Sequence, residues 1–90
     1  VPLAAFRYLR GVPRVYRSSD RGQREFCADC GSQILYRARS PATTLDLNLP
    51  CLDDPEALAP RRHIWVASRL SWFRTADDLP QHRDDGPPAP

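Results

Sequence analysis

The feature that most constrains this chain is a C-A-D-C-G run at residues 27–31. Two cysteines with two residues between them can point both thiolates at one metal ion, and a glycine after the second cysteine adopts the positive φ that such a turn requires. Small, polar residues separate the cysteines, and a β-prone segment at 33–37 follows the turn. The spacing therefore predicts a zinc-binding turn (a zinc knuckle) with Cys27 and Cys30 as ligands.

Other uses of paired cysteines fit this sequence less well. A thioredoxin-type redox pair opens a helix, whereas Gly31 and Ser32 here lead into a β-prone segment. A c-type haem site needs histidine directly after the second cysteine, where this chain has Gly31. A disulfide across so short a loop would be strained. Because structural zinc takes four ligands, the turn by itself supplies half a site.

Length and composition narrow the functional classes. Ninety residues form one small domain with a modest core, which a metal ion or a second copy would supplement. Three cysteines, an odd number, argue against a closed disulfide framework and favour a reducing, cytoplasmic location. The net charge of +2 is small, and the arginines are scattered along the chain, so nucleic-acid binding is not expected. No apolar run is long enough to span a bilayer, and no membrane association is expected.

The apolar pattern predicts a mainly β domain with short helical turns at residues 1–82, followed by a flexible, proline-rich tail at 83–90. Strict alternation at 44–49 indicates a half-buried antiparallel strand. The strands on both sides of the cysteine turn should form a hairpin with the turn at its tip, and a helical turn is expected around Pro55. The predicted strands are residues 5–10, 14–18, 23–26, 34–37, 44–49 and 63–67.

Several motifs, taken together, resemble the glutathione-dependent formaldehyde-activating enzyme family, whose domain is shared with centromere protein V. They follow the order and spacing of the C-terminal part of that domain, from about residue 5 to about residue 82. Each motif alone is weak, but the set is specific. The motifs are G-V-P-R-V-Y-R-S-S at 11–19, R-E-F-C-A-D-C-G-S at 24–32, C-L-D-D-P-E at 51–56, P-R-R-H-I-W at 60–65 and S-R-L-S-W at 68–72.

The resemblance implies a β-rich, tent-like (Mss4-like) fold with two zinc sites. It implies that Cys27 and Cys30 are ligands of a structural zinc, completed in family members by an upstream Cys-x-Cys pair. A second, activity-associated zinc is held in the family by another upstream cysteine group. The implied activity is a zinc-dependent addition of glutathione, the co-substrate, to formaldehyde, which gives S-hydroxymethylglutathione and is a carbon–sulfur lyase reaction in reverse.

The chain departs from the family pattern upstream of Cys27, because residues 1–26 contain neither cysteine nor histidine. We therefore expect a truncated form of the fold that is incomplete as an enzyme, and we assign no catalytic residue. The alternative is a non-catalytic, zinc-stabilised β module that dimerises or docks on a partner. In such a homodimer, two copies that each supply Cys27 and Cys30 would assemble one four-thiolate zinc site.

Cys51 and His63 are further candidate ligands. A cysteine just past a strand usually behaves as a small, semi-buried apolar residue, and a histidine beside a strand is usually hydrogen-bonded rather than metal-bound. Cys51 would become a third ligand only if the chain folded back onto the cysteine turn. Trp65, Trp72 and Phe73 are expected in the core or at an interface.

Overall fold

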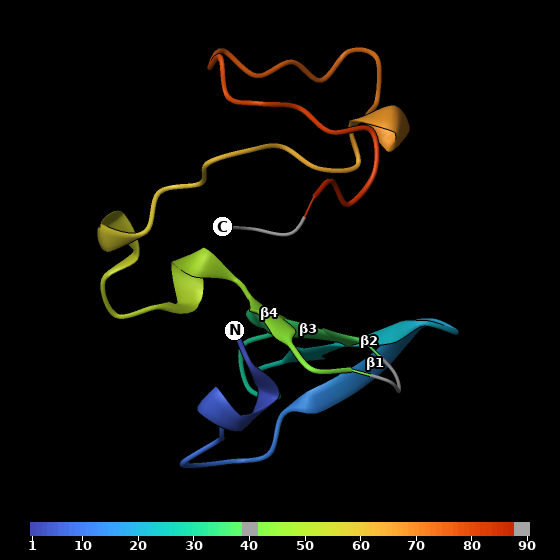
Figure 1. The fold of residues 1–90 in the computed structure, drawn as a ribbon. Helices are drawn as coiled ribbons and strands as arrows, with labels where there is room; N and C mark the ends of the chain where they lie inside the picture. Colours follow the sequence, from blue (N-terminus) through green and yellow to red (C-terminus); the bar gives the residue numbers. More distant parts are fainter. Residues whose placement is uncertain (39–41, 88–90) are drawn as a thin grey trace. The chain divides into compact units, whose positions relative to one another are not determined.

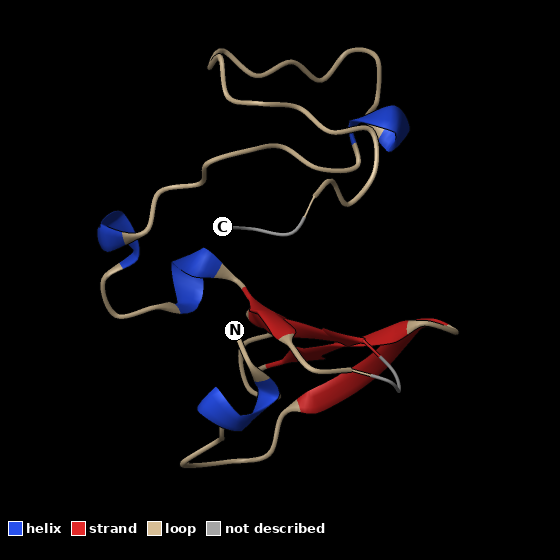
Figure 2. Cartoon of the chain, viewed as in Figure 1, coloured by secondary structure: helices blue, strands red, loops and turns tan. Residues whose placement is uncertain are grey.

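The computed structural model describes residues 1–38 and 42–87. The chain divides into two compact units, Val1–Ala57 and Leu58–Pro90 (Figure 1). The strands belong to the first unit, whereas short helical turns occur in both (Figure 2). Within the described ranges, no helix is long and apolar enough to cross a membrane.

The first unit is built on a four-stranded antiparallel sheet with strand order β1-β2-β3-β4. Each strand lies beside the strand that follows it in sequence, as expected where connections are short. This confirms the predicted mainly β class and the strands predicted at 14–18, 23–26, 34–37 and 44–49, although β4 ends at Leu47 rather than at residue 49. The strands are β1 (Arg14–Ser19), β2 (Gly22–Phe26), β3 (Gln33–Ala38) and β4 (Leu45–Leu47).

The pairing of β2 with β3 forms the hairpin that carries the cysteine turn. In its register Arg24 lies opposite Tyr36, and Glu25 lies opposite Leu35. Neighbouring residues of a strand point to opposite faces, so Glu25 and Leu35 enter the interior while Arg24 stays exposed. The predicted hairpin with the cysteine turn at its tip is confirmed.

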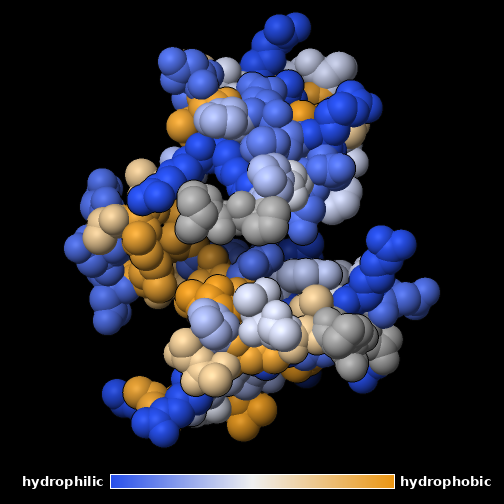
Figure 3. Space-filling model, viewed as in Figure 1, coloured by the Kyte–Doolittle hydropathy of each residue, from blue (hydrophilic) through white to orange (hydrophobic). Residues whose placement is uncertain are grey.

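The core of the first unit is small. Leu35 and Leu45 are each 2% exposed, and they are the only buried hydrophobic residues in the part of the chain that the structure describes. Apolar residues form patches on the surface instead (Figure 3). Val12, for example, is 84% exposed. A core of this size contributes little stabilisation through the burial of apolar surface.

The N-terminal residues pair with the segment that precedes β4. The Leu3 N–H donates to the Thr43 carbonyl at 3.0 Å, and the 3-10 turn η1 (Leu3–Ala5) follows. The predicted strand at residues 5–10 is wrong, because the chain leaves this pairing at the 3-10 turn. An apolar, β-prone segment becomes a strand only where a neighbouring strand can accept and donate its backbone hydrogen bonds.

Two 3-10 turns follow β4. They are η2 (Leu49–Cys51) and η3 (Pro55–Ala57). Pro50 occupies the start of η2 and Pro55 the start of η3, where a fixed φ and a missing N–H are tolerated. The helical turn predicted around Pro55 is therefore confirmed.

The second unit contains backbone hydrogen bonds between two segments, without a regular strand in its described residues. The His82 N–H donates to the His63 carbonyl at 2.9 Å. The predicted strand at 63–67 is wrong, because Trp65 adopts a left-handed φ of 59° and η4 (Val66–Ser68) begins directly after it. A positive φ at a bulky residue ends an extended segment.

The large aromatic residues of the second unit lie at the surface. Trp65 is 52%, Trp72 75% and Phe73 53% exposed. The expectation that they form a core is therefore wrong, because a unit this short has too few residues to cover them. Their role at an interface stays a prediction.

We predict that Leu35→Ala destabilises the chain by about 2–5 kcal/mol, because it removes one of the two buried leucines and leaves a cavity. Urea denaturation followed by circular dichroism measures the change. The matched control is Leu9→Ala, since Leu9 is 79% exposed and its substitution should cost less than about 0.5 kcal/mol. Equal losses for the two variants would show that the core does not lie around Leu35.

Candidate metal centre

The cysteine turn joins the end of β2 to the start of β3. The Cys27 N–H donates to the Ser32 carbonyl, and the Gly31 N–H donates to the Cys27 carbonyl, both at 2.9 Å. These two backbone hydrogen bonds close the turn at its base. Gly31 has a φ of 76°, in the left-handed region that glycine adopts without a steric penalty. The glycine after the second cysteine therefore has the conformation predicted for it.

Both thiols of the turn are free, with Cys27 partly buried and Cys30 exposed. The Cys30 Sγ lies 3.2 Å from the Ser32 Oγ. The Ser32 hydroxyl, followed by the Ser32 backbone N–H and the Cys27 thiol, lowers the pKa of Cys30. A lower pKa increases the fraction of thiolate, which is the form that binds metals. Two thiol donors on one closed turn suit zinc in their chemistry.

In the part of the chain that the structure describes, the two cysteines of the turn do not belong to a larger group of metal-binding side chains. Across residues 1–38 and 42–87, no three His, Cys, Asp or Glu side chains lie close enough to hold one metal ion. The structure therefore does not bring Cys51 or His63 to the pair formed by Cys27 and Cys30. The donors fit zinc in kind but number two of the four that a structural zinc takes.

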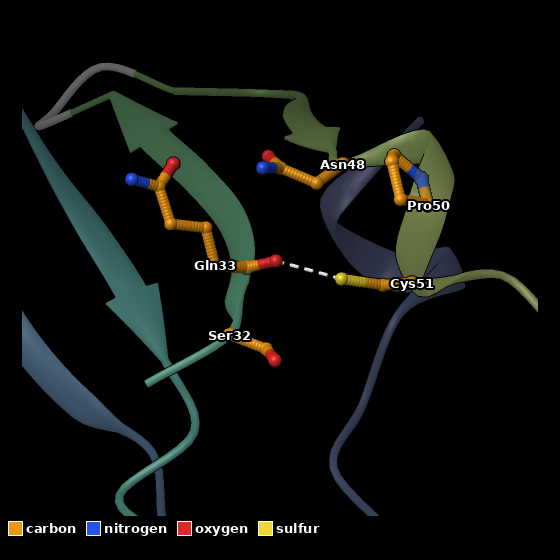
Figure 4. Close-up of a pocket in the computed structure, with 5 residues that line it drawn as sticks. All are labelled: Ser32, Gln33, Asn48, Pro50 and Cys51. Carbon is orange, nitrogen blue, oxygen red and sulfur yellow. Dashed lines mark hydrogen bonds between the residues drawn. The ribbon is translucent and has the colours of Figure 1, made fainter. Parts of the chain in front are cut away.

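Cys51 lines a separate surface pocket of about 490 Å³ between the start of β3 and η2. Its thiol donates to the Gln33 carbonyl at 2.6 Å (Figure 4). Cys51 is exposed, so the expected semi-burial of this residue is wrong. No sequence signal predicts the pocket, because its two sides come from separate segments. The lining residues are Ser32, Gln33, Asn48, Pro50 and Cys51.

A second pocket, of about 460 Å³, lies beside the cysteine turn on the outer side of the sheet. Arg24 is its charged residue, and the Arg24 guanidinium carbon lies 5.4 Å from the centroid of the Tyr36 ring. The aromatic residues of the pocket itself are Tyr16 and Phe26, so the pocket combines a cation with aromatic surface next to the turn. The lining residues are Tyr16, Arg24, Phe26, Gly31 and Gln33.

His63 has a hydrogen-bonding role in the second unit. Its Nε2 lies 2.9 Å from Asp77 Oδ1 and 3.0 Å from Asp77 Oδ2. The hydrogen bond with His63, followed by one from the Leu79 N–H, lowers the pKa of Asp77. This is the arrangement expected of a hydrogen-bonded histidine rather than a ligand.

The family comparison agrees with the motifs around the turn. A protein-family model described as "Glutathione-dependent formaldehyde-activating enzyme" matches residues 1–68, well over half of the chain. The chain belongs to this family. The family match contains the whole first unit, with the cysteine turn and both pockets, but not residues 69–82, over which the resemblance was also expected. No curated protein and no solved structure matches the chain.

The family domain also contains a buried carboxylate that sequence reasoning missed. Glu25 is 4% exposed and accepts hydrogen bonds from Tyr8 Oη and Gln23 Nε2 at 3.0 Å and from Arg37 Nε at 2.9 Å. Burial raises its pKa, but the hydrogen bonds from Gln23, Arg37 and Tyr8 outweigh burial and hold the pKa below its usual value. Burial, together with the Glu25 hydrogen bond, raises the pKa of Tyr8 to about 12.

This cluster links the N-terminal segment to the sheet, with Tyr8 bonded to β2 and Arg37 reaching across from β3. Its polar atoms are hydrogen-bonded to one another, which is how a buried charge is stabilised. We therefore interpret the cluster as structural. The sequence did not reveal that Glu25 lies on the inward side of β2, because the strand is too short for its polar–apolar pattern to show which side faces the interior.

We predict that Glu25→Gln destabilises the chain at neutral pH by about 1–3 kcal/mol, because the buried donors lose a charged acceptor. The folded-state pKa of Glu25 is lowered, so its contribution is present above the unfolded-state pKa and is lost as the pH falls through the folded-state pKa. Urea denaturation from about pH 7 to about pH 3 should therefore show the difference from the parent chain shrinking. The exposed Glu56→Gln is the control, and a pH-independent difference would contradict the assignment.

Proposed function

We propose that this chain works in the reaction of its family, the addition of glutathione to formaldehyde, and that its own contribution is to hold a structural zinc ion through Cys27 and Cys30. The observation that carries the proposal is the family match over residues 1–68, which contains the complete cysteine turn. The closed geometry of the turn supports it, because both thiols are carried by one loop of fixed backbone.

In the proposed reaction, the thiol sulfur of glutathione attacks the carbonyl carbon of formaldehyde. A carbon–sulfur bond forms, the carbonyl double bond opens, and the thiol proton ends on the former carbonyl oxygen. The product is S-hydroxymethylglutathione, no electron donor or acceptor is consumed, and the reverse reaction is that of a carbon–sulfur lyase. A zinc ion in such an enzyme acts as a Lewis acid or holds a thiolate. Cys27 and Cys30 receive a metal-holding role here, not a catalytic one.

The pocket beside the turn supports a role in binding glutathione. Arg24 lines this pocket together with Tyr16 and Gly31 of the turn. Glutathione carries carboxylate groups at neutral pH, and a guanidinium binds a carboxylate through charge-assisted hydrogen bonds. We therefore propose that Arg24 binds a carboxylate of glutathione.

A second candidate is a non-catalytic, zinc-stabilised β module that dimerises or docks on a partner. One observation favours it: the described ranges bring together no group of three or more metal-binding side chains. A catalytic zinc needs three protein ligands and an open position for substrate. The two candidates share the zinc at the cysteine turn and differ in whether the chain accelerates the reaction.

The proposal extends to fold and location. The four-stranded antiparallel sheet supports a tent-like (Mss4-like) fold with the cysteine turn as a zinc knuckle. The free state of the three cysteines supports a reducing, cytoplasmic setting, in which thiols stay available for metal.

We predict that the zinc-loaded chain accelerates the formation of S-hydroxymethylglutathione above the uncatalysed rate. Exchange NMR between free and hydroxymethylated glutathione measures the protein-dependent rate at equilibrium. The double variant Cys27→Ser, Cys30→Ser should lose the acceleration, whereas Cys51→Ser should keep it because Cys51 lies outside the turn. Zinc uptake without acceleration would contradict catalysis and favour the non-catalytic module.

We predict that Arg24→Ala raises the KM for glutathione by about tenfold or more, because loss of a charge-assisted hydrogen bond costs about 1.5–3 kcal/mol. The kcat should change little, since the carboxylates lie away from the reacting sulfur. Arg10→Ala is the matched control, as Arg10 is exposed and does not line the pocket. An unchanged KM in Arg24→Ala would place the glutathione carboxylates elsewhere.

A further inference from the structure

Gln33, at the start of β3, lines both of the pockets described above. It shares the pocket beside the cysteine turn with Arg24 (the Arg24 pocket) and the pocket beside η2 with Asn48 (the Asn48 pocket). The two residues before it line one pocket each, Gly31 the Arg24 pocket and Ser32 the Asn48 pocket. The two pockets therefore adjoin at the start of β3. Their volumes of about 460 and 490 Å³ lie within the range of small-molecule sites, about 300–1,000 Å³.

A shift in the strand register accounts for the position of Gln33. The pairing of β2 with β3 shifts by one residue between Glu25 and Phe26, so Phe26 pairs with Gln33 rather than with Ile34. Such a bulge interrupts the alternation of side chains between the two faces of a strand and can redirect a side chain toward a site. The shift therefore explains how one residue of β3 lines two pockets.

The side-chain amides of Gln33 and Asn48 are available to a ligand. Each offers a carbonyl acceptor and N–H donors, the same kinds of group that a peptide bond presents. Across residues 1–38 and 42–87, neither amide is hydrogen-bonded to another described residue. The Gln23 amide, by contrast, donates to the buried Glu25. In Figure 4 the Gln33 and Asn48 amides lie on the same side of the hydrogen bond between Cys51 and the Gln33 carbonyl.

We propose that Gln33 and Asn48 bind a peptide amide of the thiol substrate while Arg24 binds its carboxylate, so that the two pockets form one site for a small peptide thiol. This inference rests on the proposed function and deepens it, because it assigns the Asn48 pocket to the same substrate. The two side-chain amides match the donor and the acceptor of a peptide group. The site therefore selects a peptide thiol such as glutathione over a single amino-acid thiol, which has no peptide amide.

The distribution of charge determines which part of the substrate each pocket takes. Arg24 is the charged residue among those that line its pocket, whereas no Asp, Glu, Lys, Arg or His lines the Asn48 pocket. A carboxylate is stabilised beside the guanidinium, and a neutral peptide group suits a pocket of uncharged polar groups. The carboxylate end of the substrate therefore lies in the Arg24 pocket and the amide in the Asn48 pocket.

The spacing of these groups suits a substrate of this length. In the register of the hairpin, Gln33 lies opposite Phe26, which is two residues along β2 from Arg24. At about 3.3 Å per residue, the backbone positions of Arg24 and Gln33 are roughly 7 Å apart along the strand. An extended tripeptide spans about 10 Å, whereas one residue spans about 3.5 Å. A tripeptide is therefore long enough to occupy both pockets.

The experiment compares two ligands that cannot react with formaldehyde through sulfur. S-methylglutathione keeps the carboxylates and the peptide amides of glutathione, whereas S-methylcysteine has a carboxylate but no peptide amide. Each is titrated into the full 90-residue chain and followed by heteronuclear NMR, which detects the side-chain NH2 signals directly. S-methylglutathione should shift the NH2 signals of Gln33 and Asn48 and leave that of Gln81 unchanged, because Gln81 is exposed and lines neither pocket. S-methylcysteine should leave all three signals unchanged.

Variants separate recognition of the amide from recognition of the carboxylate. Gln33→Ala and Asn48→Ala should each raise the dissociation constant of S-methylglutathione about two- to tenfold, the effect of losing one neutral hydrogen bond, and leave that of S-methylcysteine unchanged. Arg24→Ala should weaken the binding of both ligands, since both carry a carboxylate. Gln81→Ala is the matched control and should change neither dissociation constant.

Three outcomes would overturn the inference. Binding of S-methylglutathione with unmoved Gln33 and Asn48 signals and unchanged affinity in both amide variants would refute the role of the Asn48 pocket, but would leave Arg24 and the proposed reaction intact. Equal losses for both ligands in the amide variants would refute recognition of the amide. Absence of S-methylglutathione binding would refute both pockets as its site, whereas catalysis is tested separately by the rate of S-hydroxymethylglutathione formation. The NMR titration of the parent chain needs no variant, so its result does not depend on whether the alanine variants fold.

Discussion

The pairing of β2 with β3 is the interaction on which the rest of the first unit depends. Its register places Glu25 opposite Leu35 in the interior and Arg24 opposite Tyr36 outside. The same pairing closes the cysteine turn at one end of the hairpin. Because strand side chains alternate between faces, a slip of one residue would expose Leu35 and turn Arg24 away from its pocket. One backbone register therefore fixes the core, the turn and the pocket together.

Local signals in the sequence predicted the parts of the fold that local chemistry determines. Alternation at 44–49 predicted β4, and the proline at 55 predicted a helical turn. The strands predicted at 5–10 and 63–67 are absent, although their composition is equally β-prone. Composition does not show whether a neighbouring edge is available or whether a residue such as Trp65 takes a positive φ. Both depend on the rest of the chain.

The same distinction applies to the candidate site. The two-residue spacing of Cys27 and Cys30 identified the turn, because both donors and the glycine lie within one loop. Two of the partners of Glu25 are distant in sequence, Tyr8 by 17 residues and Arg37 by 12, so the fold of the chain brings them together. A charged residue in a short strand is predicted to be exposed unless its partners from distant parts of the sequence are known. The two pockets were missed for the same reason, since neither is lined by one continuous segment.

The small core gives the cysteine turn a further importance. Two leucines are the buried hydrophobic residues in the described ranges, which is little for a domain whose typical stability is about 5–15 kcal/mol. Apparent binding free energies of structural zinc are about 10–16 kcal/mol, comparable with that whole stability. A metal that binds only the folded turn therefore stabilises the entire hairpin, and through the β2–β3 register it stabilises the core and the Arg24 pocket as well.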